Sequence, residues 1–383
     1  MDDETLWLAT TLARPVSPKL CIELRNWHRE PGALRQALQK AFDGEPQAEC
    51  PLSQQHLHAL PTANTAARVN QALEWQSSSS QHHLLGLDHP LYPRTLSELP
   101  DAPLLLYAVG ELTALDGPGI SIVGSRKASY HGTGHAFEFA RRLAESGLSI
   151  TSGLAVGIDA AAHRGALRAS GITIAVAATD ASRVYPKQHQ ALNQEIIDNG
   201  GLILHEFPLG TPVRPWCFPQ RNRIISGLSH GVLVIEAALP SGTLTTARHA
   251  LEQGREIMAI PGSIAHREAR GCHALIKDGA ALVETPDDVL HCLGAQLKHS
   301  LDQPEQASLL HELGCPTPGP MSSPLTADEK IVLANMTTEY VSVDILQQAT
   351  GLPIAQLSAT LGTMELKHLI MSATGGRYTR LKT

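Results

Sequence analysis

The pattern of apolar positions changes twice along the chain. Residues 4–74 carry apolar side chains at helical spacing, as in Leu20, Leu24 and Trp27. This spacing predicts a small helical domain over residues 1–80. The serine-rich run Ser77–His83 has the composition of a linker and would close it.

From Ile120 onward, short apolar segments alternate with helical ones. This alternation predicts a mostly parallel, doubly wound α/β sheet as the core of a domain over residues 81–294. Such sheets bind ligands beyond the carboxyl ends of their strands, so the loops that follow the strands are the candidate site. The predicted strands are Ile120–Val123, Leu148–Thr151, Thr173–Ala178, Leu202–Phe207, Val232–Ala237, Ile257–Ile260 and Ala281–Glu284. The predicted helices lie near 133–146, 158–170, 188–199, 220–229, 243–254 and 272–278.

The last part of the chain begins with a segment rich in Pro, Gln and Gly, which predicts a flexible linker over residues 295–323. Residues 324–383 then read as three short helices and a hairpin. Gly375 and Gly376 would form the turn between strands Leu369–Ser372 and Tyr378–Leu381. Helices followed by such a hairpin predict a winged-helix domain.

Charge is distributed unevenly over the 383 residues. The net charge is −7 at pH 7, but residues 119–284 hold 16 Lys and Arg against 13 Asp and Glu. Local rather than total charge governs phosphate binding, so the central region can bind phosphate although the whole chain is negatively charged. The six cysteines include no C-x-x-C pair, which excludes the usual zinc and disulfide patterns. Without a signal sequence or a membrane-length apolar run, we expect a soluble, cytoplasmic protein.

The segment Phe218–Gly227 carries the most informative motif, Phe-Pro-Gln-Arg-Asn-Arg. We interpret Arg221, Asn222 and Arg223 as the first turn of a helix. A helix N-terminus attracts anions, and each arginine can bind two phosphate oxygens at once. The motif therefore predicts a phosphate site.

Four further loops have the composition of phosphate-binding loops. Glycine allows close approach of the backbone, while hydroxyl and cationic groups donate to phosphate. Taken alone, each loop is also compatible with an ordinary basic turn or a capped helix start. The candidate phosphate-binding residues, with those of the motif, are Ser125, Arg126, Ser152, Gly153, Lys187, Arg221, Asn222, Arg223, Ser241, Gly242 and Thr243.

Enzymatic signatures are lacking around this predicted site. Gly227–Gly231 matches G-x-S-x-G, but the order of strand and helix around Ser229 is the reverse of a hydrolase elbow. Neither a dinucleotide fingerprint nor a G-x-x-x-x-G-K-[ST] loop is present. Asp159 and His163 lie one turn apart without a third metal ligand nearby. We predict no catalytic residue, no metal and no cofactor.

Many of these motifs together resemble the DNA-processing protein A (DprA/Smf) family, over about residues 85–290. The resemblance rests on several separate segments in the same order. They include Val123–Arg126, Ser152–Ala155, Gly157–His163, Tyr185–Lys187, Phe218–Gly227, Ser241–Ala247 and Leu275–Ala280. The sequence departs from the family pattern at Ser125, at Ala128 and at His273, whose role is left open; none of these changes removes a charged contact.

The resemblance implies an extended Rossmann-like core with a SAM-like helical domain before it and a winged helix after it. It also implies binding of single-stranded DNA in natural transformation, protection of incoming DNA and loading of a RecA-type recombinase. A homodimer formed through the core is a further implication. Direct DNA contacts would carry over to Arg126, Lys187, Arg221 and Arg223.

Two rival functions remain. A nucleotide phosphoribohydrolase of the LOG type has a similar fold, but its catalytic glutamate would fall on Thr246, which cannot ionise. A pure interaction scaffold leaves the clustered arginines unexplained. Within the winged helix, the candidate recognition helix 353–368 has Lys367 as its single Lys or Arg, which favours protein docking over DNA binding.

Overall fold

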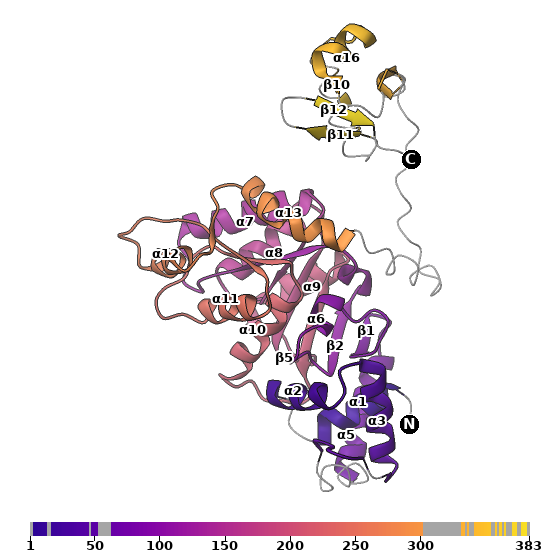
Figure 1. The fold of residues 1–383 in the computed structure, drawn as a ribbon. Helices are drawn as coiled ribbons and strands as arrows, with labels where there is room; N and C mark the ends of the chain where they lie inside the picture. Colours follow the sequence, from indigo (N-terminus) through magenta and orange to yellow (C-terminus); the bar gives the residue numbers. More distant parts are fainter. Residues whose placement is uncertain are drawn as a thin grey trace. The chain divides into compact units, whose positions relative to one another are not determined.

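The computed structural model describes residues 3–13, 17–45, 47–52 and 63–301, and in the C-terminal part 331–333, 335–336, 341–353, 357, 360–361, 364, 370–373 and 377–380. Its contacts divide the chain into two units, Met1–Gln306 and Ala307–Thr383. The first unit contains an N-terminal group of helices and a large sheet (Figure 1). Among the described helices, none is long and apolar enough to cross a membrane.

A nine-stranded sheet forms the centre of the first unit. Its strands are β1 (His82–Gly86), β2 (Leu105–Gly110), β3 (Gly119–Val123), β4 (Ser149–Ser152), β5 (Thr173–Asp180), β6 (Leu202–Phe207), β7 (Gly231–Val234), β8 (Glu256–Ala259) and β9 (Ala281–Leu282). They lie in the order β1-β2-β6-β5-β4-β3-β7-β8-β9. From β6 to β9 all neighbours are parallel, whereas β1 and β2 are antiparallel. The predicted doubly wound sheet is thereby confirmed.

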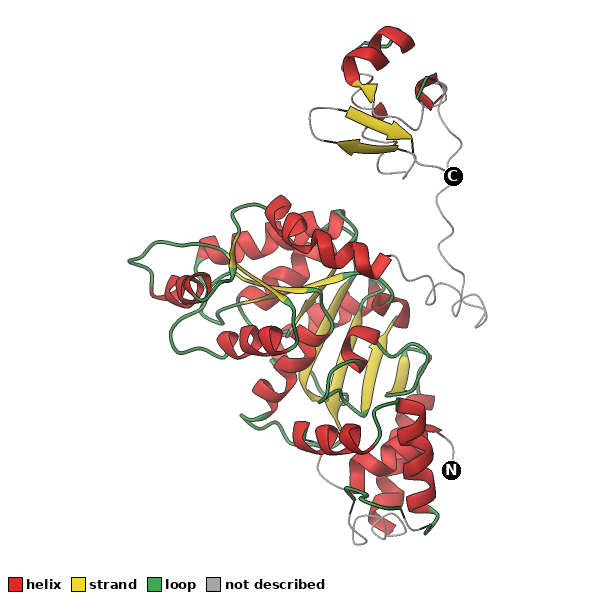
Figure 2. Cartoon of the chain, viewed as in Figure 1, coloured by secondary structure: helices red, strands yellow, loops and turns green. Residues whose placement is uncertain are grey.

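Helices cover both faces of this sheet (Figure 2). The longer ones are α7 (Tyr130–Glu145), α8 (Ile158–Arg168), α9 (Gln190–Asp198), α10 (Cys217–Gly227), α11 (Thr243–Glu252), α12 (Arg270–Lys277) and α13 (Pro286–Leu301). Short helical turns are α6 (Arg94–Ser97), η1 (Leu112–Leu115), η2 (Lys187–His189) and η3 (Arg267–Ala269).

Alternation of side chains along the central strands produces two hydrophobic layers. On β3, Ile120 and Ile122 pack in the layer that contains residues of α7, α8 and α13. Val123 belongs to the layer that contains residues of α10, α11 and α12. Successive side chains of a strand point to opposite faces, so a strand buried on both faces reads as one continuous apolar run. For this reason, apolar runs in the sequence predict the central strands.

The N-terminal helices are α1 (Asp3–Ala13), α2 (Pro18–Trp27), α3 (Pro31–Phe42) and α5 (Ala63–Ser77). Helices α1 and α5 contact β1 at the antiparallel edge of the sheet, α3 contacts α1, and α2 contacts α3. Trp7 is fully buried and its Nε1 donates to Asp88 Oδ1 at 2.6 Å. Arg35 pairs with the other oxygen of Asp88 at 2.8 Å. Because the helices share one hydrophobic cluster with the sheet, the predicted boundary near residue 80 does not separate two cores.

Strands β1 and β2 are absent from the sequence prediction. The predicted linker Ser77–His83 is instead the end of α5, a turn and the first residues of β1. The polar composition of this run predicted a linker, but β1 is an edge strand, and its first residues His82 and His83 are polar and half-buried. The apolar run Leu104–Tyr107 was a signal for β2, since short runs of this kind are typical of buried strands.

In the second unit, β10 (Val341–Ser342), β12 (Arg377–Arg380) and β11 (Ile370–Ala373) form a small sheet beside α16 (Val343–Thr350). The predicted hairpin is confirmed, and each of its strands is displaced by one residue from the predicted bounds. The predicted turn at Gly375 and Gly376 lies outside the described residues, as does most of the candidate recognition helix.

The linker predicted over residues 295–323 begins inside a helix. Helix α13 extends to Leu301, so the first residues of the predicted linker are helical, and residues 302–323 lie outside the described part.

Candidate functional site

The predicted phosphate loops all follow the carboxyl ends of parallel strands. Residues 124–129 follow β3, 153–157 follow β4, 181–186 follow β5 and 235–242 follow β7. Strands β3 and β7 are neighbours, and the chain order reverses between them. Such a reversal leaves a crevice at the carboxyl edge, where doubly wound proteins bind ligands.

The side chain of Glu236, just after β7, lies at the N-terminus of helix α7, which borders this crevice. Its Oε2 accepts from the Ser129 backbone N at 2.8 Å and its Oε1 from Ser129 Oγ at 2.6 Å. Ser129 Oγ in turn caps α7 by accepting from Gly132 N. The crevice therefore already holds a carboxylate where a dinucleotide fold would place pyrophosphate. Sequence reasoning missed this role of Glu236.

Replacing Glu236 by alanine should lower the free energy of unfolding by about 1–3 kcal/mol, because the Ser129 donors lose their partner. Added sulfate should recover part of this loss by binding at the vacated helix start. Urea unfolding with and without sulfate measures both effects. Glu195→Ala, an exposed residue of α9, is the control. Equal stability of the two variants would contradict the assignment.

Arg126, in the loop after β3, is an exposed cation at the crevice. Its guanidinium carbon lies 4.8 Å from the centroid of the Phe218 ring, a cation–π arrangement. The Tyr185 ring lies 5.7 Å from the same Phe218 ring, edge to face, and is 47% exposed. Two loops and the first turn of α10 thus bring together a cation and two aromatic rings. Aromatic residues make up only 4% of the chain, so composition gives no indication of this local pair.

Arg221 has a different position from the one predicted. Helix α10 begins at Cys217, so the arginines lie beyond the first turn. Arg221 is 4% exposed and donates from Nη1 to the carbonyl oxygens of Gly153, at 2.5 Å, and Val176. Burial lowers its pKa to about 10, and buried Asp159 nearby offsets this effect. Arg221 holds the loop after β4 in place and adds positive charge behind Arg126.

Arg223 does not fit the predicted DNA contact. Its side chain is fully buried and forms an ion pair with Glu206, which is equally buried. It also donates to the carbonyl oxygen of Asp101 at 2.6 Å. A phosphate could reach this guanidinium only by displacing Glu206. The interpretation of Arg223 as a surface phosphate ligand is wrong for this conformation, and its role is to hold the core together.

The last residue of β4 and the first residue of the loop after it are both buried. Ser152 is fully buried and donates from Oγ to the Ile122 carbonyl at 2.6 Å. Gly153 is buried, and a Cβ there would lie 2.4 Å from Arg221 Nη1. Ser152 is therefore a core residue, and Gly153 is required to make room for the arginine rather than for a ligand.

The other candidates lie at or near the surface of the carboxyl edge. Lys187 and Gly242 are exposed, and Ser125, Asn222, Ser241 and Thr243 are half-buried. Asn222 Nδ2 donates to the Gly242 carbonyl at 3.3 Å, which brings the motif of α10 beside the start of α11. Ser241 Oγ is buried with no hydrogen-bond partner in the described part of the chain. The structure thus brings most of the predicted loops together.

Metal and histidine chemistry gains no support at this edge. Within the described residues, no group of three or more His, Cys, Asp or Glu is placed to hold a metal. His163 donates from Nδ1 to Thr173 Oγ1 at 2.7 Å, since that hydroxyl already donates to the Ile150 carbonyl. Burial lowers the pKa of His163 to about 3, so it is a neutral core residue.

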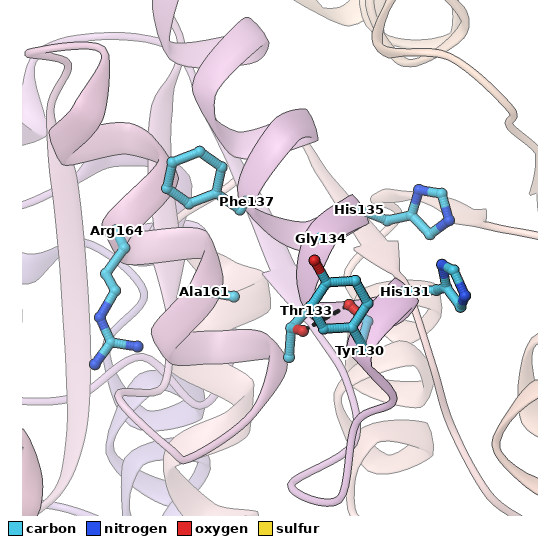
Figure 3. A pocket seen from close by; sticks show the side chains of 8 residues that line it. All are labelled: Tyr130, His131, Thr133, Gly134, His135, Phe137, Ala161 and Arg164. Atoms are coloured by element: carbon cyan, nitrogen blue, oxygen red, sulfur yellow. Dashed lines mark hydrogen bonds between the residues drawn. The ribbon is translucent and has the colours of Figure 1, made fainter.

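An open cavity of about 440 Å³ lies on α7 and α8, next to the loop that carries Arg126. In Figure 3, His131 and His135 project from the same side of α7, the Tyr130 ring lies beside Thr133, and Arg164 projects from α8. None of the described lining residues is acidic. Arg164 therefore adds positive charge to the surface beside the crevice.

Comparison with known proteins gives two family matches. Residues 83–294 match the family described as DNA recombination-mediator protein A, and residues 316–376 match the DprA winged helix domain. Protein Smf of Escherichia coli (strain K12) is 38% identical over 342 residues, which cover 86% of this chain and 89% of that protein. DNA processing protein DprA of Streptococcus pneumoniae is 47% identical over 199 residues, covering 52% of this chain and 70% of that protein.

Two solved structures have the same fold in their matched part. DNA processing protein A from Streptococcus pneumoniae matches with a TM-score of 0.56 and 35% identity, covering 73% of this chain and 98% of that one. DNA processing protein A from Helicobacter pylori matches with a TM-score of 0.51 and 30% identity, covering 57% and 97%. The latter structure is described as giving insight into a unique single-stranded DNA binding mode.

Proposed function

Because the chain belongs to the DNA recombination-mediator protein A family, we propose that it binds single-stranded DNA along the carboxyl edge of its sheet. One observation carries this proposal: exposed Arg126 lies over Phe218, with Tyr185 beside the same ring. Phosphate binds the cation, while unstacked bases have aromatic faces to stack on. Lys187, exposed two residues after Tyr185, supplies a second phosphate contact.

Buried Arg221 acts on the DNA through its field rather than by contact. Its charge reaches the crevice from behind Arg126, and Asp159 compensates part of it. The half-buried donors Ser125, Asn222, Ser241 and Thr243, with exposed Gly242, extend the path toward the start of α11. Direct contact is therefore assigned to Arg126 and Lys187, and these other groups are secondary.

The biological role that we propose is non-catalytic. The protein would protect incoming single strands during natural transformation and help load a RecA-type recombinase onto them, as family membership suggests. The rival phosphoribohydrolase function has no specific support: Thr246, at the position of the catalytic glutamate, is 2% exposed within α11.

A homodimer formed through the core is the second part of the proposal. Its support is exposed apolar surface near the β9 edge of the sheet. Leu282 on β9 is 50% exposed, and Ile264, in the loop after β8, is 86% exposed. Pairing of two copies over this edge would remove both side chains from water.

The salt dependence of DNA affinity distinguishes a site in which two cations contact phosphates from one in which four do. Each phosphate neutralised on a single strand contributes a slope of about −0.7 in log K against log salt. With Arg126 and Lys187 as the direct contacts, we expect a slope of about −1.4 per protomer, against about −2.8 if Arg221 and Arg223 also reached phosphates. Fluorescence anisotropy with single-stranded and duplex oligonucleotides across salt concentrations measures this. Equal affinity for duplex, or a zero slope, would overturn the proposed function.

A further inference from the structure

A second cavity, of about 470 Å³, is lined by residues of β1, β2, β6, α9 and the loop after β5. Its volume is within the roughly 300–1,000 Å³ typical of small-molecule sites. Lys187 lines this cavity, so it opens beside the end of the proposed DNA path.

The sheet provides one wall of the cavity. His82 pairs with Val109, and Val109 pairs with Ile203, so these three side chains share one face of the sheet. His205 lies two residues after Ile203 and therefore points to the same face. All four line the cavity. The wall thus alternates apolar surface with imidazole groups.

Both imidazoles are held through Nδ1 by a backbone carbonyl. His205 Nδ1 lies 2.9 Å from the Thr179 carbonyl oxygen, and His82 Nδ1 lies 2.8 Å from that of Trp75. A carbonyl oxygen accepts only, so each Nδ1 carries a proton, and in neutral His205 this leaves Nε2 as an acceptor. His205 is 5% exposed, and burial lowers its pKa to about 4, which keeps it neutral. A neutral buried acceptor is suited to an amino or hydroxyl group of a ligand.

The opposite side supplies cations and amides. Arg183 and Lys187 are exposed there, with half-buried Asn193 and exposed Gln190 on α9. Buried Asp180 pairs with Arg183 at 3.2 Å and accepts from the Ser182 backbone, which fixes the loop. None of the described lining residues is acidic. Since Asp180 offsets only one of the two cations, the site favours an anion that also offers hydrogen-bonding edges.

The geometry points to a nucleotide site: base against the β1–β2–β6 face, amide groups of α9 on its edge, and phosphate at Arg183 and Lys187. The nucleotide is either free or one unit of a bound strand, and only the second source rests on the proposed function. The apolar wall and the two amides match a base, and the two cations match its phosphate. An inorganic anion would use only the cations.

Binding of dTMP and of a short oligothymidylate to the full chain tests this inference. Asn193→Leu and Arg183→Gln should each weaken binding about tenfold, while Gln194→Leu, on the same helix but outside the cavity, should not. If dTMP binds and is weakened by the cavity variants, the site takes free nucleotides. If only the oligonucleotide is weakened, it takes a unit of the strand.

Wild-type binding of both ligands by both cavity variants would overturn the inference. Thermal unfolding checks that the variants are folded. Arg126→Glu distinguishes the two proposals, because it should weaken oligonucleotide binding by about 100-fold or more and leave dTMP binding unchanged. Normal oligonucleotide binding by this variant, together with cavity-dependent dTMP binding, would remove the proposed function and retain the nucleotide site.

Discussion

Arg126→Glu is expected to weaken binding of single-stranded DNA by about 100-fold or more without unfolding the protein. The substitution removes a charge-assisted contact, removes the cation over Phe218 and places a negative charge in the path of the phosphates. Together these effects amount to about 3 kcal/mol, or two orders of magnitude in Kd. Arg126 is exposed, so the fold should tolerate the change.

Two further variants sharpen this measurement. Arg168→Glu makes the same charge change at an exposed site at the far end of α8 and should change binding little. Arg126→Lys keeps the charge but loses the planar group over the ring, so an intermediate affinity is expected. Titration by anisotropy at fixed salt measures all three. Equal losses for Arg126→Glu and Arg168→Glu would mean that net charge, rather than this site, governs binding.

Arg223→Met is expected to lower the free energy of unfolding by about 3–5 kcal/mol, because it leaves Glu206 buried without its partner. If Arg223 were the direct DNA contact that the family resemblance implies, its replacement would instead affect DNA binding and leave stability unchanged. The double variant Arg223→Met with Glu206→Leu should recover much of the stability, since it removes both buried charges.

Urea unfolding measures these differences, with Arg214→Met as the control at an exposed arginine. If Arg223→Met remained as stable as the wild type yet lost DNA binding, Arg223 would be a direct phosphate contact after all. If the double variant is stable and binds DNA normally, the arginine serves the core alone.

Local pattern was sufficient to place most of the sheet. Strand β6 matches its predicted bounds, and other central strands differ by a few residues at their ends, because strands buried on both faces produce apolar runs. The edge strand β1 escaped prediction because its first two residues are polar and half-buried. Its identity depends on pairing with β2, which no local pattern expresses.

The sequence by itself determined the fold class, the family and the set of loops at the carboxyl edge, because all three follow from local periodicity and short motifs. Only the tertiary structure decided which cations face solvent. Arg126 and Arg223 are equally charged in the sequence, but Arg223 meets Asp101 and Glu206, which are distant in the chain, inside the core. Burial arises from packing between remote segments, and for this reason a motif rich in arginine could not by itself separate a DNA contact from a core ion pair.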